Sequence, residues 1–539
     1  MVNPMPPMFD VNYSLVNGGV RCPENTSAGF RKPVFVCRMV LSVDMKSACQ
    51  KVPGFILNLA LCHFSILTVT AADNLASQLR AVFEDPEYSR SLWGVKVQSV
   101  SNGETLFELN AEKLLMPASN MKLLTAIAAL EFLGPDYRYS TKVKASGRIE
   151  KGTLKGDLIV VGSGDPTLGA RLSSPDPLKL EDGDPLAVFL DWVQRLKSLG
   201  IRRIQGDLIG NDQVFGGPDL GKGWAWDDLA HGYSAPLSGL QYNENVVVLQ
   251  INSKRDSSGV PTVRMVPDYP SLQINNLLTF VPECREWEYD LDRIIGKNKI
   301  VLRGSVPSNK STLWSTVSVE RPAEFFLSIL KQVMSDQGIK VDGVARVLSS
   351  ERELEDTRTL FSHESPSLRF IVRILLKVSQ NLYAETLVRT MDRRPFAKTF
   401  EKGREVLELT MQYAGIPEDA YVIADGSGLS RYNLLTPEAI ISLLHFSFSQ
   451  PYREDFLKAL PVAGVDGTIS QRLKGTVVPG KIRAKTGSLE SVRSLSGYVV
   501  TPDGETLAFS MIVNNYDERR KDAEAVQDLA LQYMSRFTR

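Results

Sequence analysis

Apolar and polar residues alternate along much of the segment from Leu92 to Leu109, and the alternation is interrupted at Asn102-Gly103. A period of two is typical of β-strands, and Asn-Gly favours a tight turn, so the segment predicts a β-hairpin. The pattern then changes to one that favours a helix. This helix is expected to open at Pro117-Ala118-Ser119 and to stop at Leu133-Gly134-Pro135, because glycine and proline end helices.

Short apolar runs separated by glycine, aspartate and proline fill the chain from about residue 143 to residue 350. Examples are Leu158–Val161 and Val246–Ile251, and a predicted helix near Ala187–Leu199 breaks the series. Runs of this length and spacing are typical of strands. The pattern therefore predicts a mostly β insertion of one or two subdomains. We find no internal repeat in the sequence.

Helical periodicity returns at Ser367 and continues to Leu387. The later part of the chain predicts helices at about Lys402–Ala414 and after Thr436-Pro437, strands at Ile482–Thr486, Leu495–Val500 and Leu507–Val513, and a last helix at Asp522–Phe537. The last helix lacks the strongly basic face of a membrane-surface helix, so we expect it to pack on a sheet.

Residues 45–72 have the order of charge and apolarity of a secretory signal peptide. Met45-Lys46 is followed by an apolar run from Phe55 to Val69 and by Thr70-Ala71-Ala72. We therefore expect export to the periplasm or the wall side of the membrane, with cleavage near Ala72. An uncleaved anchor is the alternative, but the run is short for a span of about 20 residues. Because residues 1–44 have no export pattern, we expect translation to start at Met45 rather than at Met1.

The 539 residues include 62 lysines and arginines and 62 aspartates and glutamates. The net charge of zero offers no basic surplus for nucleic acid. Cys284 is the only cysteine beyond residue 72, so we expect no internal disulfide after cleavage. Neither HExxH nor CxxC occurs, and we expect no metal and no organic cofactor. The few histidines leave a Ser-His-Asp triad open, but neither G-S-G sequence matches the G-x-S-x-G pattern of such enzymes.

Three short motifs occur in a fixed order, and together they predict a serine acyl-transfer site. They are S-x-x-K at Ser119–Lys122, S-x-N at Ser379–Asn381 and K-T-G at Lys485–Gly487. Each motif alone has a plain structural interpretation: a helix cap with a solvated lysine, a polar patch on a helix, or a strand that ends in a turn. All three together, in this order and on suitable elements, favour catalysis.

The residue types suit a nucleophile and its base. Ser119 and Lys122 are three apart on one predicted helix, so their side chains share a face. Lys122 takes the serine proton only when it is neutral, and burial next to another cation such as Lys485 lowers a lysine pKa. The N–H of Ser119 at the helix start is placed to face a developing oxyanion.

The other two motifs suit the substrate. Ser379 is expected to relay a proton to the leaving group, and the amide of Asn381 to hold the substrate backbone. Lys485 and Thr486, on an edge strand, are expected to bind a substrate carboxylate, and substrate backbone can pair along that strand.

The sequence resembles class C low-molecular-mass penicillin-binding proteins, the D-Ala-D-Ala carboxypeptidase/endopeptidase family. Beyond the trio, the likeness rests on longer segments spread over the chain after residue 72: Ser163–Leu168, Gly223–Leu229, Tyr233–Pro236, Asn243–Asn245, Ser379–Glu385, Ala424–Arg431 and Leu460–Thr468. The resemblance implies an α+β fold with a transpeptidase-like or β-lactamase-like catalytic domain, in which helices flank an antiparallel sheet. It also implies a large insertion between the first two motifs, which are 379 − 119 = 260 residues apart here.

The resemblance also implies roles for single residues. The oxyanion hole would be the N–H groups of Ser119 and Ser488. A pocket for the stem-peptide side chain would use Asp228, Tyr233 and Arg431, with Asp228 facing an amino group and Arg431 a carboxylate. One position departs from the pattern, because Glu490 is acidic where a neutral residue is expected. This puts the fine side-chain preference in doubt.

We therefore expect three parts: an N-terminal extension and signal peptide at 1–72, a catalytic domain at 73–142 plus 351–539, and a β-rich insertion at 143–350. The expected function is a serine D-Ala-D-Ala carboxypeptidase/endopeptidase, peripheral to the cell wall, that acts on peptidoglycan stem peptides and cross-links and binds β-lactams. A serine β-lactamase and a non-catalytic wall-binding protein are the alternatives. The sequence leaves open the oligomeric state and the balance of the two activities.

Overall fold

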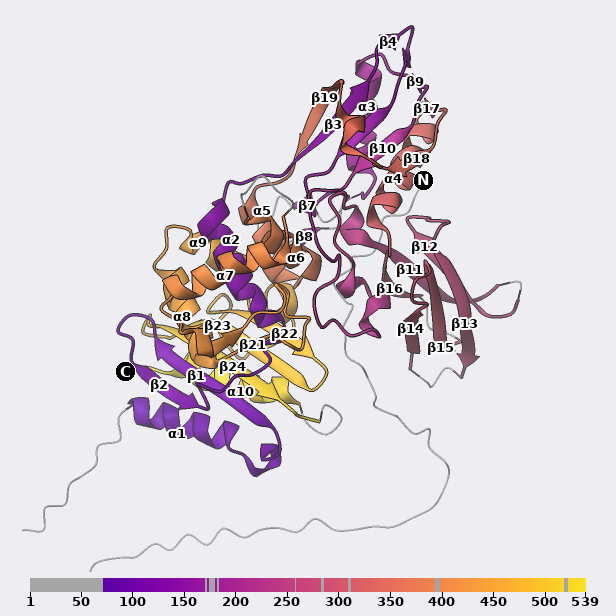
Figure 1. Ribbon diagram of the computed structural model, residues 1–539. Coiled ribbons are helices and arrows are strands. Elements are labelled where there is room, and N and C mark those ends of the chain that lie inside the picture. The colour runs from indigo at the N-terminus through magenta and orange to yellow at the C-terminus, as the bar shows by residue number, and fades with distance from the viewer. Residues whose placement is uncertain are drawn as a thin grey trace, which may run out of the picture.

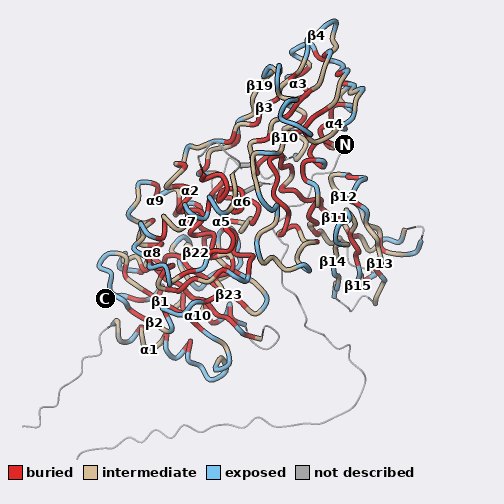
Figure 2. The backbone as a smooth tube through the Cα atoms, in the orientation of Figure 1, coloured by how far each residue is buried: buried red, intermediate tan, exposed pale blue. Residues whose placement is uncertain are grey.

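The computed structural model describes residues 71–169, 172–173, 180–181, 184–256, 258–282, 286–308, 312–392, 398–517 and 522–539. Most of the expected signal peptide and Cys284 lie outside the described residues. Within the described ranges, no helix combines the length and the apolar character that crossing a membrane requires. Figure 2 shows that buried backbone runs through both the sheet-and-helix part and the inserted part of the molecule.

An antiparallel five-stranded sheet has the order β2-β1-β24-β23-β22. Its strands are β1 (Leu92–Ser99), β2 (Thr105–Leu109), β22 (Ile482–Leu489), β23 (Val492–Val500) and β24 (Thr506–Asn514). The predicted hairpin is confirmed, with Val97 opposite Phe107. The first and last strands of the described residues therefore share one sheet, in which β1 is hydrogen-bonded to β24 (Figure 1).

Helices cover both faces of this sheet. On one face lie α1 (Ala71–Phe83) and α10 (Ala523–Arg536), whose buried side chains share a core with the sheet. On the other face lies a helical layer with its own core: α2 (Met121–Leu133), α5 (Leu368–Lys377), α6 (Asn381–Thr390), α7 (Phe400–Tyr413), α8 (Pro437–Phe448) and α9 (Arg453–Ala459). A small pair, β20 (Tyr421–Val422) and β21 (Leu434–Leu435), lies beside it. The last helix packs on the sheet, as predicted.

The predicted continuous helix from Ser367 to Leu387 is wrong. The structure has two helices, α5 and α6, separated by Val378-Ser379-Gln380. Ser379 has a φ of 61°, in the left-handed region that breaks a right-handed helix. Apolar periodicity hides this break because both helices bury the same kind of face in one core.

The inserted part has its own buried core and contains β-strands together with two long helices, α3 (Ala187–Ser198) and α4 (Pro322–Asp336). One five-stranded sheet has the order β18-β10-β6-β3-β19, and two three-stranded sheets have the orders β12-β11-β16 and β13-β15-β14. Their strands are β3 (Ser140–Ser146), β6 (Leu158–Val161), β10 (Leu208–Asn211), β11 (Val246–Arg255), β12 (Pro261–Val266), β13 (Gln273–Val281), β14 (Glu288–Arg293), β15 (Lys299–Pro307), β16 (Thr312–Ser318), β18 (Ala345–Val347) and β19 (Thr357–Glu364). A separate pair is β7 (Leu172–Ser173) and β8 (Leu180–Glu181). Because β19 pairs with β3, the chain after residue 350 still contributes to a sheet of this part.

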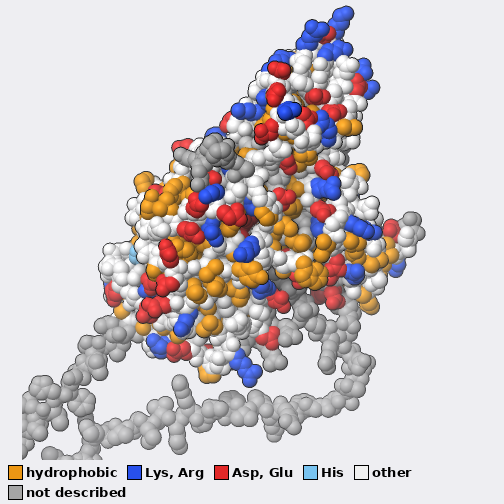
Figure 3. All heavy atoms as spheres, in the orientation of Figure 1, with side chains coloured by type: hydrophobic (Ala, Val, Ile, Leu, Met, Phe, Trp, Pro, Cys, Tyr) orange, Lys and Arg blue, Asp and Glu red, His pale blue; other side chains and the backbone are white. Residues whose placement is uncertain are grey.

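A short internal repeat, which sequence inspection missed, builds the far end of the inserted part. A further sheet has the order β17-β9-β5-β4, with β4 (Ile149–Glu150), β5 (Thr153–Leu154), β9 (Arg203–Ile204) and β17 (Lys340–Val341). Each of β5, β9 and β17 is followed within a few residues by a strand of the five-stranded sheet, and equivalent strands pair in parallel. The shared sequence is little more than a glycine before the second strand, which is too short a signal for detection. Figure 3 shows lysine and arginine side chains gathered at this end.

Candidate active site

Ser119 lies in a short 3₁₀ turn, Ala118–Asn120, directly before α2. Two glycines allow other segments to approach this turn closely. A Cβ atom on Gly428 would lie 1.8 Å from the carbonyl oxygen of Ala118, and one on Gly487 would lie 2.9 Å from the nitrogen of Ser119. The third motif therefore passes directly beside the backbone N–H of Ser119, and any side chain at Gly487 would crowd it.

Lys122 is the second residue of α2, and its fully buried side chain makes three contacts. Its Nζ lies 2.8 Å from Ser119 Oγ, 2.5 Å from Asn381 Oδ1 and 2.6 Å from the carbonyl oxygen of Ser427. The last two atoms are acceptors only, so a neutral amine donates its two hydrogens to them. The remaining lone pair then faces Ser119 Oγ, which is the geometry that a general base requires.

The second motif begins at the break between α5 and α6. Ser379 Oγ accepts a hydrogen bond from Lys485 Nζ at 2.8 Å. Asn381 starts α6, and its Nδ2 donates to the carbonyl oxygen of Tyr233 at 2.7 Å while its Oδ1 accepts from Lys122. The left-handed residue Ser379 thus allows Ser379 and Asn381 to contact the two lysines from one short loop.

The third motif lies on the edge strand β22. Lys485 is fully buried, and its carbonyl oxygen accepts a hydrogen bond from Asn120 Nδ2 at 3.0 Å. The N–H of Ala484 points away from β23, because it donates to Pro461 outside the sheet at 3.0 Å. Strand residues alternate, so the N–H groups of Thr486 and Ser488 face the same outer edge. This edge is open to pairing beyond the segment at Pro461 and lies beside Ser119.

Burial controls the electrostatics of the two lysines. It lowers the pKa of Lys122 to about 7, although the nearby carboxyl groups of Asp425 and Glu385 act in the opposite direction. Burial, and next the charge of Lys122, lowers the pKa of Lys485 well below its usual value. A lysine whose pKa lies near neutrality is available as a base at physiological pH.

Two buried acids that sequence reasoning did not assign hold the Ser427 segment in place. Glu385 Oε1 accepts the N–H groups of Gly426 and Ser427, both at 3.0 Å. Burial, and next the neighbouring Asp425, raises the pKa of Glu385 to about 7. Asp425 in turn accepts the N–H groups of Gly428 and Ser430. Both acids lie in segments that carry the family resemblance, and that membership was the available signal.

Of the three expected pocket residues, Asp228 and Tyr233 are half-buried and Arg431 is exposed. Tyr233 donates its hydroxyl to Asp228 Oδ1 at 2.7 Å. Arg431 lies on the exposed loop after Ser430 and pairs with Glu490. Its Nη2 lies 3.8 Å from Glu490 Oε2. The two loops touch, since Trp224 Nε1 donates to Asp425 Oδ2 at 2.9 Å. The structure thus joins Asp228 to Tyr233 and gives Arg431 an acidic partner of its own.

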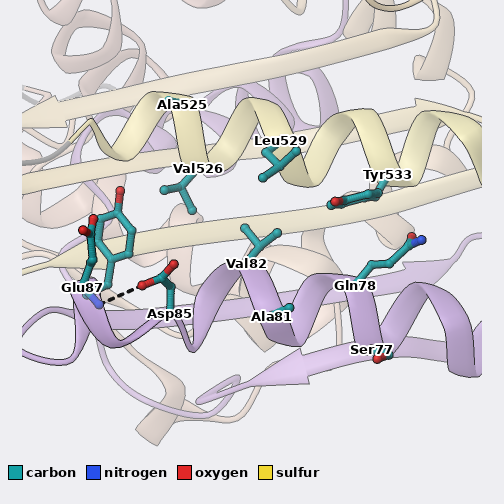
Figure 4. Close-up of a pocket in the computed structure, with 11 residues that line it drawn as sticks. Ser77, Gln78, Ala81, Val82, Asp85, Glu87, Ala525, Val526, Leu529 and Tyr533 are labelled. Carbon is teal, nitrogen blue, oxygen red and sulfur yellow. Dashed lines mark hydrogen bonds between the residues drawn. The ribbon is translucent and has the colours of Figure 1, made fainter. Parts of the chain in front are cut away.

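A separate groove of about 550 Å³ lies between α1 and α10, and none of the motif residues lines it (Figure 4). Its walls come from Ser77, Gln78, Ala81, Val82, Asp85, Glu87, Tyr88, Ala525, Val526, Leu529 and Tyr533. It lies on the face of the sheet opposite to α2, the helix that follows Ser119. Among the described residues, no three His, Cys, Asp or Glu side chains gather in a way that would hold a metal ion.

Comparison with known proteins gives one consistent result. The family model described as "D-Ala-D-Ala carboxypeptidase 3 (S13) family" matches residues 75–533. A D-alanyl-D-alanine carboxypeptidase of Actinomadura sp. (strain R39) is 32% identical over 463 residues, which cover 82% of this chain and 81% of that protein. A penicillin-sensitive carboxypeptidase A of Dictyostelium discoideum is 27% identical over 472 residues, which cover 83% of this chain and 87% of that protein. The crystal structure of penicillin binding protein 4 from Haemophilus influenzae superposes with a TM-score of 0.71 at 25% identity, over 86% of this chain and 98% of that one.

Proposed function

Because the chain belongs to the D-Ala-D-Ala carboxypeptidase 3 (S13) family, and is therefore a serine DD-peptidase, we propose that Ser119 is its nucleophile and Lys122 the base. The α+β, penicillin-binding-protein fold agrees with this family. The observation that carries the residue assignment is the environment of Lys122. Its two fixed acceptors leave the amine lone pair for Ser119, and its pKa is lowered to about 7 by burial.

In the proposed reaction, neutral Lys122 takes the hydroxyl proton of Ser119 as Oγ bonds to the carbonyl carbon of the penultimate D-alanine. The oxyanion that forms is stabilised by the N–H groups of Ser119 and Ser488. Its collapse breaks the peptide bond, and the Ser379 hydroxyl, bonded to Lys485, passes a proton to the departing D-alanine amine. Water then attacks the ester: its hydroxyl group forms the new carboxyl group, its remaining proton replaces the one given up through Ser379 and Lys485, and Lys122 returns its proton to Ser119.

We assign the substrate contacts in the same way. Lys485 and Thr486 receive the terminal carboxylate of the stem peptide, and the peptide backbone adds to the open edge of β22 beside Gly487. Asn381 holds an amide of the substrate. Asp228, with Tyr233, faces the amino group of a side chain such as that of diaminopimelate, and Arg431 faces its carboxylate.

The first test is intact-protein mass after incubation with benzylpenicillin, on the wild type and on Ser119→Ala. We expect a stable adduct on the wild type and none on the variant, together with loss of D-alanine release from a D-Ala-D-Ala peptide. No adduct on either protein would favour a non-catalytic wall-binding protein. A short-lived adduct with rapid release of hydrolysed penicillin would favour a β-lactamase.

Two finer parts of the proposal need their own experiments. Cleavage of D-Ala–diaminopimelate cross-links predicts that purified sacculi release uncross-linked peptides, and their absence would limit the enzyme to carboxypeptidase action.

Export predicts that the mature protein, isolated from the cell envelope, begins near Asp73. A mature N-terminus at Met1 or Met45 would contradict cleavage near Ala72.

A further inference from the structure

A buried ion pair outside the three motifs connects the second motif to the third. Lys377 is the last residue of α5, two positions before Ser379, and only 2% of it is exposed. Its Nζ lies 2.6 Å from both carboxylate oxygens of Asp466 and 2.6 Å from the carbonyl oxygen of Leu460. All three hydrogens of this ammonium group therefore have acceptors in one segment, residues 460–468.

The same pair fixes the shape of that segment, which we call the 460–468 loop. Asp466 Oδ1 also accepts the N–H of Val462 at 2.9 Å, which closes the loop on itself. A Cβ atom on Gly467 would lie 2.9 Å from the carbonyl oxygen of Lys377, so the loop is packed tightly on the end of α5. Gly467 also has a φ of 63°, which other residues rarely adopt.

The loop ends beside the residues that receive the substrate carboxylate. Its first part pairs with β22, through Pro461 and Ala463, and covers the edge of the sheet as far as Ala484. Its last residue, Thr468, is exposed, and its hydroxyl accepts a hydrogen bond from Thr486 Oγ1 at 2.7 Å. The loop thus leaves the edge open from Thr486 onward and adds a second hydroxyl at this point.

The ion pair is poorly explained by stability alone. Removing two charges from water costs several kcal/mol each, and apolar replacements of both partners in other proteins are often as stable or more stable. A buried pair that also ties two active-site loops together is better explained by the geometry that it imposes.

We propose that the Lys377–Asp466 pair is a positioning device that holds the Thr468 hydroxyl against Thr486, and that Thr468 thereby determines specificity for a substrate with a free terminal carboxylate. Because Thr486 donates its hydroxyl hydrogen to Thr468, the hydroxyl hydrogen of Thr468 is left to donate to the carboxylate, beside the ammonium group of Lys485. This inference rests on the proposed function, because it assumes that the carboxylate binds at Lys485 and Thr486.

The first experiment compares Thr468→Val with Thr468→Ser on two substrates, a peptide that ends in D-Ala-D-Ala and its C-terminal amide. Loss of a hydrogen bond to a charged group predicts that Thr468→Val lowers kcat/KM about tenfold for the acid, mainly through KM, with little change for the amide. Thr468→Ser is expected to retain the preference. Thr476→Val is the control, since Thr476 is also exposed, lies in the following segment and donates its hydroxyl to the carbonyl oxygen of Leu473. Equal losses on both substrates, or none, would overturn the role of Thr468.

The second experiment separates positioning from stability with the double variant Lys377→Met/Asp466→Leu. Asp466→Asn alone leaves the lysine without its counter-charge and is expected to lower Tm, and the double variant is expected to recover it. If the pair positions Thr468, the double variant still loses the preference for the free acid. A double variant with wild-type Tm and wild-type preference would show that the pair is only structural. Adduct formation by the wild-type protein with benzylpenicillin is measured alongside. If the adduct forms, a negative result above counts against this inference alone; if it does not form, the proposed function itself has failed.

Discussion

The three motifs and the expected side-chain pocket differ sharply in how firmly the fold holds them. Lys122 and Lys485 are fully buried, and each contacts residues from distant parts of the chain. Arg431 and Glu490 are exposed, with 42% and 77% of their side chains accessible, and their carboxylate contact is long at 3.8 Å. The two motif lysines are therefore fixed by packing, whereas the residues proposed to contact the substrate side chain lie at the surface.

This difference has a physical basis. A neutral lysine is obtained by burial, and burial requires that every remaining polar atom nearby has a partner. A charged pocket for a water-soluble side chain needs no such support, and exposed ion pairs contribute little energy. Substitutions in the motif cluster should consequently have large effects on rate, and substitutions in the pocket small effects on selectivity.

The largest effect is expected for Lys122→Met, which keeps the length of the side chain but removes the base. General-base catalysis contributes about 10²- to 10⁴-fold, so acylation by benzylpenicillin should slow by a factor in that range. Stopped-flow or mass-spectrometric acylation rates provide the measurement. Lys151→Met, at an exposed lysine of the inserted part, is the control. An unchanged rate in Lys122→Met would remove Lys122 as the base.

The pH dependence of acylation tests the same group without a mutation. Burial lowers the pKa of Lys122 to about 7, and only the neutral amine accepts a proton, so the rate should rise with pH up to about 7 and then level off. Below that point the rate should fall about tenfold per pH unit. Second-order acylation rates between pH 5 and 9, with circular dichroism to monitor folding, provide the measurement. A flat profile over this range would contradict the assignment.

A smaller effect is expected at Glu385, where two substitutions should differ. Glu385→Gln keeps the oxygen that accepts the N–H groups of Gly426 and Ser427, and we expect a near-wild-type enzyme. Glu385→Ala leaves both N–H groups buried without this acceptor. Each unsatisfied group should lower the free energy of unfolding by about 1–3 kcal/mol. Urea denaturation of both variants checks this. If the two variants behave alike, the hydrogen bonds to Ser427 do not fix the acceptor of Lys122.

The smallest effect is expected at the pocket. Glu490→Gln removes the acidic partner of Arg431 and should favour substrates whose side chain carries a carboxylate. Exposed pairs contribute about 0.2–1 kcal/mol, so kcat/KM for a diaminopimelate peptide should rise only a few-fold relative to a lysine peptide. Arg431→Ala should have the opposite effect and lower kcat/KM for the diaminopimelate peptide relative to the lysine peptide. An effect as large as that of Lys122→Met would mean that the pocket and the motif cluster are not separable.

The sequence predicted the elements that rest on local patterns. The hairpin at β1 and β2, the helix after Thr436-Pro437 and the last strands follow directly from alternation, capping and turn residues. It did not predict the break at Ser379, since the apolar period continues across it. It also missed the helix α4, although Pro322 at its first turn was a usable start signal. The division of the chain at residues 142/143 and 350/351 stays a prediction.

The sequence by itself determined which chemical groups the site has available, because the three motifs specify a serine, two lysines and their partners. Only the tertiary structure decided what those groups are able to do. The pKa of Lys122 depends on burial and on contacts with Asn381 and Ser427, which are 259 and 305 residues away along the chain. The proposed connection from Lys377 through Asp466 to Thr468 likewise depends on the end of α5 packing against the distant 460–468 loop. Burial and orientation are properties of packing, and no local pattern encodes them.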